Sequence, residues 1–131
     1  MSKVYPINVL IKGVVLRGEL ISAWQKPDEI SLSYQYDNKR YLATHKFPFF
    51  ALVEIRKELE IVGGLLMCNG ARRDVYPSGM SMSGVMAYVL VLGKQAGSPI
   101  SIFDPCKDVK KLSTIAEQKN HWNTWIQGFR R

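Results

Sequence analysis

The sequence has few of the residues that metal and redox sites need. It contains two histidines and two cysteines in 131 residues. His45 and His121 lie far apart, without the short spacing that metal-binding histidines show. Cys68 and Cys106 form neither a metal-ligand pattern nor a redox motif. We therefore expect no metal site and no cofactor, and we expect both cysteines to be reduced structural thiols.

Motifs for nucleophilic or phosphate chemistry are also lacking. No nucleophile motif frames Ser78, Ser81 or either cysteine, and Gly70, Gly79 and Gly84 form neither GxGxxG nor a P-loop. Most carboxylates fall at predicted turns or on exposed strand faces, where solvation explains them better than acid–base catalysis. The sequence thus predicts a binding protein without catalytic residues, and a small hydrolase is the less favoured alternative.

Long apolar runs are absent as well. No segment approaches the roughly 18 apolar residues of a membrane span. Near the N-terminus, Pro6, Asn8 and Lys12 interrupt any apolar segment of the signal-peptide type. We therefore expect a cytoplasmic protein without a membrane partner. The length fits a single domain, residues 1–131, that can bury its own core.

Negative charge is in deficit. The sequence has 18 Lys and Arg against 11 Asp and Glu, a net charge of +7 that raises attraction to polyanions. Trp122 and Trp125 are suited to stacking bases beside a basic tail, although tryptophans at helical spacing are more often core. Two interpretations of the C-terminal segment therefore stay open, a nucleic-acid-binding stripe and a solvated helix face. Its basic residues are Lys107, Lys110, Lys111, Lys119, Arg130 and Arg131.

The first third of the chain shows the alternation of strands. In Ile30–Tyr36, apolar and polar residues alternate with a period of two. The pair Asp37-Asn38 follows, and both residue types tolerate the left-handed backbone of a two-residue hairpin. We predict an antiparallel meander of four strands: Val4–Ile11, Val14–Trp24, Ile30–Tyr36 and Lys39–His45.

The period changes at Pro48. Apolar residues spaced by three and four positions predict a helix from Pro48 to Val62 that lies on the sheet. Proline suits the first turn of this helix, and a glycine pair can end it. Arg56 and Glu60 are placed for a weak i,i+4 ion pair on its outer side.

These segments together predict an α+β fold, in which an antiparallel sheet of about six or seven strands is covered on one face by two helices. The second helix is expected to begin near Asp108 or at Thr114, whose spacing to Glu117 matches a capping box. The remaining strands are expected at Leu65–Cys68, Val85–Leu92 and Pro99–Phe103. The residues expected to be buried are Leu16, Leu20, Leu32, Tyr34, Leu52, Ile55, Leu59, Val89 and Val91.

The segment before Val85–Leu92 has the composition of a recognition surface. Met80 and Met82 have flexible side chains that adapt to a partner, and Arg, Tyr and Met are enriched in interfaces. Pro77 and Gly79 fit a tight turn if Gly79 takes a positive φ. The alternative is that Tyr76 and the methionines close the edge of the core, with the arginines merely solvated. The candidate partner-binding residues are Arg72, Arg73, Asp74, Tyr76, Met80 and Met82.

The run CNGARRDVYPSGM at residues 68–80, then Ser83-Gly84, Ala87-Tyr88 and the ISIFDP strand, resembles segments of small bacterial immunity proteins. These proteins neutralise polymorphic or contact-dependent inhibition toxins. The resemblance covers roughly Cys68 to Pro105 and implies a cognate protein toxin, of nuclease type, as the partner. Nucleases with basic active sites would favour an acidic inhibitor. The net charge of +7 therefore predicts an acidic toxin surface or docking away from the nucleic-acid cleft.

Overall fold

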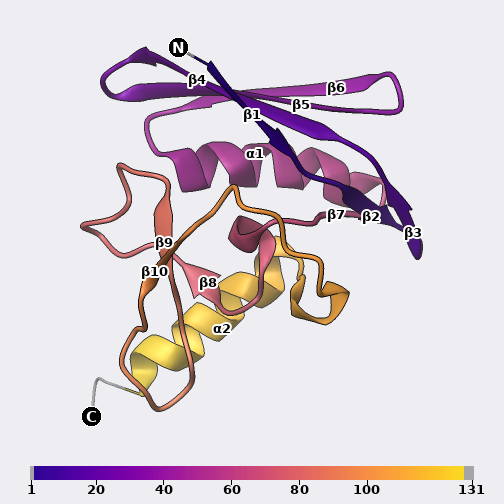
Figure 1. Ribbon diagram of the computed structural model, residues 1–131. Helices are drawn as coiled ribbons and strands as arrows, with labels where there is room; N and C mark the ends of the chain where they lie inside the picture. The colour runs from indigo at the N-terminus through magenta and orange to yellow at the C-terminus, as the bar shows by residue number, and fades with distance from the viewer. Residues whose placement is uncertain (1, 129–131) are drawn as a thin grey trace.

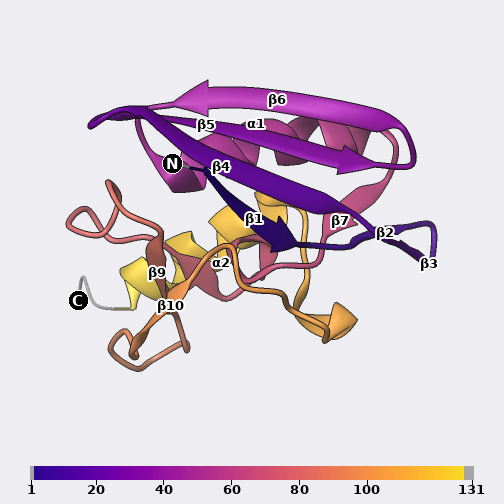
Figure 2. The same ribbon diagram turned by 45° about the horizontal axis from the view of Figure 1, so that its top comes forward.

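The computed structural model describes residues 2–128, which form an α+β fold with two α-helices and three antiparallel sheets (Figure 1). Arg130 and Arg131 of the predicted basic tail lie outside the described residues. The largest sheet has the order β1-β4-β5-β6, and Figure 2 shows these four strands side by side. This sheet confirms the predicted meander. Its strands are β1 (Ser2–Pro6), β4 (Glu19–Lys26), β5 (Glu29–Tyr36) and β6 (Lys39–His45).

The first two predicted strands each break in the middle, at Ile7 and Gly18. The amide of Ile7 donates to the carbonyl of Gly18 over 3.1 Å, and the buried Tyr34 hydroxyl donates to the carbonyl of Ile7 over 2.7 Å. A Cβ atom on Gly18 would collide with the Tyr34 hydroxyl and lie 2.8 Å from the Ile7 oxygen. Glycine therefore allows the two strand segments and Tyr34 to meet at this point.

Beyond the break, the chain enters a different sheet. This second sheet has the order β3-β2-β7, formed by β2 (Val9–Ile11), β3 (Val14–Leu16) and β7 (Gly64–Leu66). The third sheet has the order β10-β9-β8, formed by β8 (Val75–Tyr76), β9 (Met86–Val89) and β10 (Pro99–Ser101). The prediction of one sheet with six or seven strands is therefore wrong, because the breaks and short strands divide the pairing among three sheets.

The β5–β6 hairpin has the predicted turn, since Asp37 and Asn38 have φ of 47° and 62°. The prediction for Val91 is wrong, because β9 ends at Val89 and Val91 is 49% exposed. The carbonyl of Val91 instead accepts the Lys94 amide in a turn. Leu16 and Val89 are half-buried against the core. The other predicted core residues are buried: Leu20, Leu32, Tyr34, Leu52, Ile55 and Leu59.

Helix α1 (Pro48–Ile61) lies against the inner face of the large sheet (Figure 1). It begins at the predicted proline and ends before Gly63, whose φ is 76°. Helix α2 (Ile115–Gln127) begins with the predicted capping box, in which Thr114 and Glu117 exchange hydrogen bonds. Those bonds from Thr114 lower the pKa of the Glu117 carboxyl. Neither helix is long and apolar enough to cross a membrane, within the part of the chain that the structure describes.

The position of α2 corrects the prediction that both helices cover the sheet. Figure 1 shows α1 between the large sheet and α2, so of the two helices it is α1 that packs on that sheet. Helix α2 contacts α1 and β8 instead. The physical reason is a buried polar network centred on Gln118, which an apolar sheet face could not satisfy.

Arg56 is the other centre of this network, and it is 2% exposed rather than on the outer side of α1. Its guanidinium donates to the carbonyls of Gly70 and Ser113 over 3.2 and 3.1 Å, and to Oε1 of Gln118 over 2.6 Å. Burial lowers the pKa of Arg56. The predicted pair with Glu60 is replaced by a bond from the Ile115 amide to the Glu60 carboxylate. Polar contacts thereby join α1 to the start of α2.

Gln118 completes the network from the side of α2. Its Nε2 atom lies 2.8 Å from the carbonyl oxygens of Gly70 and Arg72 and 2.9 Å from that of Val75. These carbonyls belong to a segment that includes the 3-10 helix η1 (Asn69–Ala71) and β8. A second 3-10 helix, η2 (Val109–Lys111), precedes α2. Gln118 thus fixes β8 against α2.

Candidate functional site: an aromatic pocket

A pocket of about 380 Å³ opens between α2, the start of α1 and two loops, residues 77–85 and 90–98. Both loops lie on the left of Figure 1, the side on which α2 ends. We call it the aromatic pocket. Its main lining residues are Phe50, Tyr76, Met82, Tyr88, Trp122 and Trp125.

Ring packing fixes one wall of the aromatic pocket. Tyr76 follows the buried Val75 in β8, and its ring stacks on Trp122 of α2 with centroids 4.9 Å apart and planes at 22°. The Phe49 ring meets Tyr76 edge-on at 5.1 Å. Burial raises the pKa of the Tyr76 hydroxyl, which therefore stays neutral. The wall is a rigid aromatic surface that joins α1, β8 and α2.

Hydrogen bonds fix the opposite wall. The indole Nε1 of Trp125 donates to the carbonyl of Lys94 over 2.8 Å. The Nε2 atom of His121 lies 2.7 Å from the carbonyl oxygen of Leu90, so that nitrogen carries the proton. Both bonds tie α2 to residues 90–98, although this loop contains no strand or helix.

The loop of residues 77–85, which we call the Met80 loop, is held by its own hydroxyls. Ser78 and Ser81 each accept from the other's backbone amide, over 2.9 and 3.1 Å, and their hydroxyls lie 3.2 Å apart. Gly79 has no positive φ, so the expected glycine turn is replaced by this serine turn. Met80 at its tip is 95% exposed. The loop therefore presents a solvent-exposed methionine side chain on a turn that is held by hydrogen bonds.

The six predicted partner-binding residues fall in three places. Tyr76 and Met82 line the aromatic pocket, and Met80 lies on the adjoining loop. Arg72 and Asp74 form a bidentate ion pair, with both N–O distances 3.0 Å. The exposed Arg73 lines a separate hollow of about 360 Å³, together with Glu117 and His121 of α2. The structure thus brings Tyr76, Met80 and Met82 together and separates the three charged residues from them.

Four of the six main lining residues were not among the predicted partner-binding residues. Trp122 and Trp125 have helical spacing, which favoured an interpretation as core, but both are only half-buried and line the pocket. Phe50 lies in the first turn of α1 and Tyr88 in β9. In the sequence, the available signal for these residues was their aromatic character. Whether an aromatic residue lies in the core or lines a pocket depends on long-range packing, which here brings four distant segments together.

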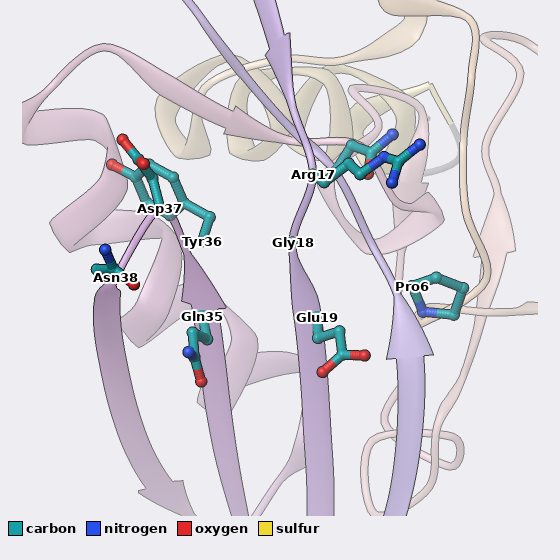
Figure 3. A pocket seen from close by; sticks show the side chains of 9 residues that line it. Pro6, Arg17, Gly18, Glu19, Gln35, Tyr36, Asp37 and Asn38 are labelled. Atoms are coloured by element: carbon teal, nitrogen blue, oxygen red, sulfur yellow. The ribbon is translucent and has the colours of Figure 1, made fainter.

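A larger hollow of about 580 Å³ lies where β1 and β5 end and β4 begins (Figure 3). Figure 3 shows its charged and amide side chains spread apart, since Arg17 and Glu19 extend to the right of Gly18 whereas Gln35, Asp37 and Asn38 lie to its left. A site that binds one small ligand needs converging polar groups, so the aromatic pocket is the better candidate.

A nucleophile–base pair would need a histidine ring bonded to a serine or cysteine. Both described histidine rings are bonded to backbone groups instead. The Nδ1 atom of His45 accepts the Phe47 amide over 3.0 Å, whereas His121 bonds to a carbonyl. Cys68 is fully buried, and burial raises the pKa of its thiol to about 11, which makes it a poor nucleophile. Within residues 2–128, no group of three His, Cys, Asp or Glu residues is placed to hold a metal ion.

The fold and site define an α+β domain with an apolar aromatic pocket beside an exposed loop. No protein-family model matches the chain, and no curated protein matches it in sequence. Such a pocket binds by removing apolar surface from water.

Proposed function

We propose that this protein is a small cytoplasmic binding protein that neutralises a cognate protein toxin by stoichiometric binding. Immunity proteins, which residues 68–105 resemble, act in this way. The observation that carries the proposal is the aromatic pocket next to the ordered Met80 loop. Aromatic residues and methionine are enriched at interfaces, and binding energy concentrates where such side chains fill pockets. In this proposal the protein is not an enzyme, and it inhibits the toxin through binding contacts alone.

Stoichiometric protection requires that the protein binds its toxin with high affinity. The inhibitor must stay bound while the toxin meets its substrate, which requires nanomolar affinity or better, about −12 kcal/mol at 25 °C. Rigid binding surfaces lose less entropy on association. The ring stack of Tyr76 on Trp122 and the serine bonds of the Met80 loop provide such rigidity.

One observation also favours a second candidate, a nucleic-acid-binding module. Trp122 and Trp125 line an open pocket on a chain of net charge +7, and single-strand binders combine stacking aromatics with positive charge. Binding of this kind weakens steeply with salt because neutralised phosphates release counterions. A salt titration therefore separates the two candidates.

The proposal predicts a gene directly upstream for a large secreted protein with a C-terminal toxin domain, and its test is titration calorimetry with that domain. We expect one-to-one binding, and we expect Met80→Asp to weaken it by at least ~30-fold, about 2 kcal/mol, because a carboxylate would replace an interface thioether. The free energy of unfolding should change by less than about 0.5 kcal/mol, since Met80 is 95% exposed.

Leu42→Asp is the matched control. Leu42 is 67% exposed on β6, in the large sheet that lies away from the aromatic pocket. We expect this variant to bind like the wild type. Equal losses in both variants would argue against an interface at the Met80 loop. Absence of toxin binding, with salt-sensitive binding to an oligonucleotide, would favour the second candidate.

A further inference from the structure

We infer that the aromatic pocket receives a bulky apolar side chain from an acidic segment of the partner protein. This inference rests on the proposed function, and it adds the chemistry of the partner: an aromatic or large aliphatic residue with aspartate or glutamate on both sides. Three features carry it, namely the uncharged lining of the pocket, the exposed lysines next to its lining residues and the pairing of the nearby carboxylates.

The lining excludes a charged occupant. None of the described residues that line the pocket carries a formal charge, and the aromatic rings are accompanied by Met82, Leu90 and Ile126. A charge that entered would lose its hydration without finding a partner, which is costly. The volume of about 380 Å³ falls in the range of ligand sites. An apolar side chain therefore fits the interior.

Three lysines lie close to lining residues of the pocket, either along the chain or through a contact. Lys46 lies 5.6 Å from the centroid of the Phe47 ring, which is 6.4 Å from the ring of Phe50 in the pocket lining. The backbone carbonyl of Lys94 accepts the indole N–H of Trp125, which lines the pocket. Lys119 is on α2, one turn before Trp122. All three lysines are exposed, so their charges act on whatever approaches the pocket.

The carboxylates closest in sequence to the lining residues are already engaged. Glu54, one turn after Phe50 on α1, forms an ion pair of 3.1 Å with Lys57. Asp74, two residues before Tyr76, pairs with Arg72. These pairings offset the negative charge near the pocket, and the net charge of the chain is +7. The surroundings of the pocket therefore attract an acidic segment, over about 10 Å at 0.1 M salt.

The lining favours a protein segment over a nucleotide base. A buried base needs hydrogen-bond partners along its edge. The Ser78 hydroxyl in the lining is engaged with Ser81, and the Trp125 indole N–H is engaged with the Lys94 carbonyl. The remaining polar side-chain groups of the lining are the two hydroxyls of Tyr76 and Tyr88, which are too few for the several polar atoms of a base edge. Aliphatic groups such as Leu90 and Ile126 offer no partners, whereas they suit the side chain of phenylalanine.

The test is NMR titration of the ¹⁵N-labelled protein with short blocked peptides. The sequence contains three tryptophans, and the indole N–H signals of Trp122 and Trp125 report on the pocket, while that of Trp24 on β4 is an internal control. The probes are Asp-Glu-Phe-Glu-Asp, Lys-Lys-Phe-Lys-Lys and Asp-Glu-Ala-Glu-Asp. We expect the acidic phenylalanine peptide to shift both pocket signals, and to bind at least ~10-fold more tightly than the basic peptide at low salt. The alanine peptide should leave both signals unchanged.

Charge reversal tests the role of the lysines. The double variant Lys46→Glu with Lys94→Glu should lose the preference for the acidic peptide, with an unchanged thermal unfolding midpoint, because both residues are exposed. Lys12→Glu with Lys39→Glu, at exposed positions in the turn between β2 and β3 and at the start of β6, is the matched control and should keep that preference.

Two results would overturn the inference. Failure of every phenylalanine peptide to shift the pocket signals would exclude an apolar side chain, and equal binding of the acidic and basic peptides would exclude an acidic segment. Shifts produced only by an oligothymidine strand would assign the pocket to nucleic acid instead. Neither peptide result bears on toxin binding itself, which the calorimetric titration measures separately.

Discussion

Replacing Arg56 with alanine is expected to lower the free energy of unfolding by about 3–5 kcal/mol. The guanidinium is buried and donates to two carbonyls and to Gln118. Its removal leaves the Ser113 carbonyl and the Gln118 amide oxygen short of a donor in a site without solvent, and each such group costs about 1–3 kcal/mol. Urea unfolding monitored by tryptophan fluorescence measures the loss.

Lys57→Ala is the control, since Lys57 is the next residue on α1 and is exposed. It should change the free energy of unfolding by less than about 0.5 kcal/mol. Arg56→Met keeps most of the apolar stem but also lacks the donors, so we expect a similarly large loss. A loss below about 1 kcal/mol in both Arg56 variants would mean that the network joining α1 to α2 contributes little to stability.

Ile55→Ala should destabilise the fold by about 2–5 kcal/mol, through lost apolar burial and the cavity left behind. Ile55 is 0% exposed in the middle of α1, where the helix packs on the large sheet. Ile61 at the end of the same helix is 84% exposed, so Ile61→Ala makes the same chemical change without a cavity. It should cost less than about 0.5 kcal/mol. If Ile55→Ala costs less than about 1 kcal/mol, that face of α1 is not core.

Local patterns were sufficient for the elements with clear signals. Alternation at residues 30–36 predicted β5, the Asp37-Asn38 pair predicted its hairpin, and Thr114 with Glu117 predicted the start of α2. These signals act between near neighbours in sequence. They do not specify which strands share a sheet, and the number of strands in the main sheet was therefore overestimated.

The misplaced residues depend on long-range contacts. Arg56 looked like a surface charge because its partners, Gly70, Ser113 and Gln118, are distant in sequence. For the same reason the sequence did not predict a pocket, although two of the predicted partner-binding residues, Tyr76 and Met82, line it. The composition around Tyr76 indicated a recognition surface, but its contact with Trp122 depends on how α2 packs against β8.

The central claim is that the protein works by binding its partner through the aromatic pocket and the Met80 loop. Hydrogen–deuterium exchange of the free and toxin-bound protein tests this claim directly. Amides in loops exchange quickly because few of them are hydrogen-bonded, so residues 77–85 and 90–98 should become protected in the complex. The exposed turn at Asp37 and Asn38, on the large sheet, should exchange at an unchanged rate. Protection confined to that sheet, with both pocket loops unchanged, would contradict the account.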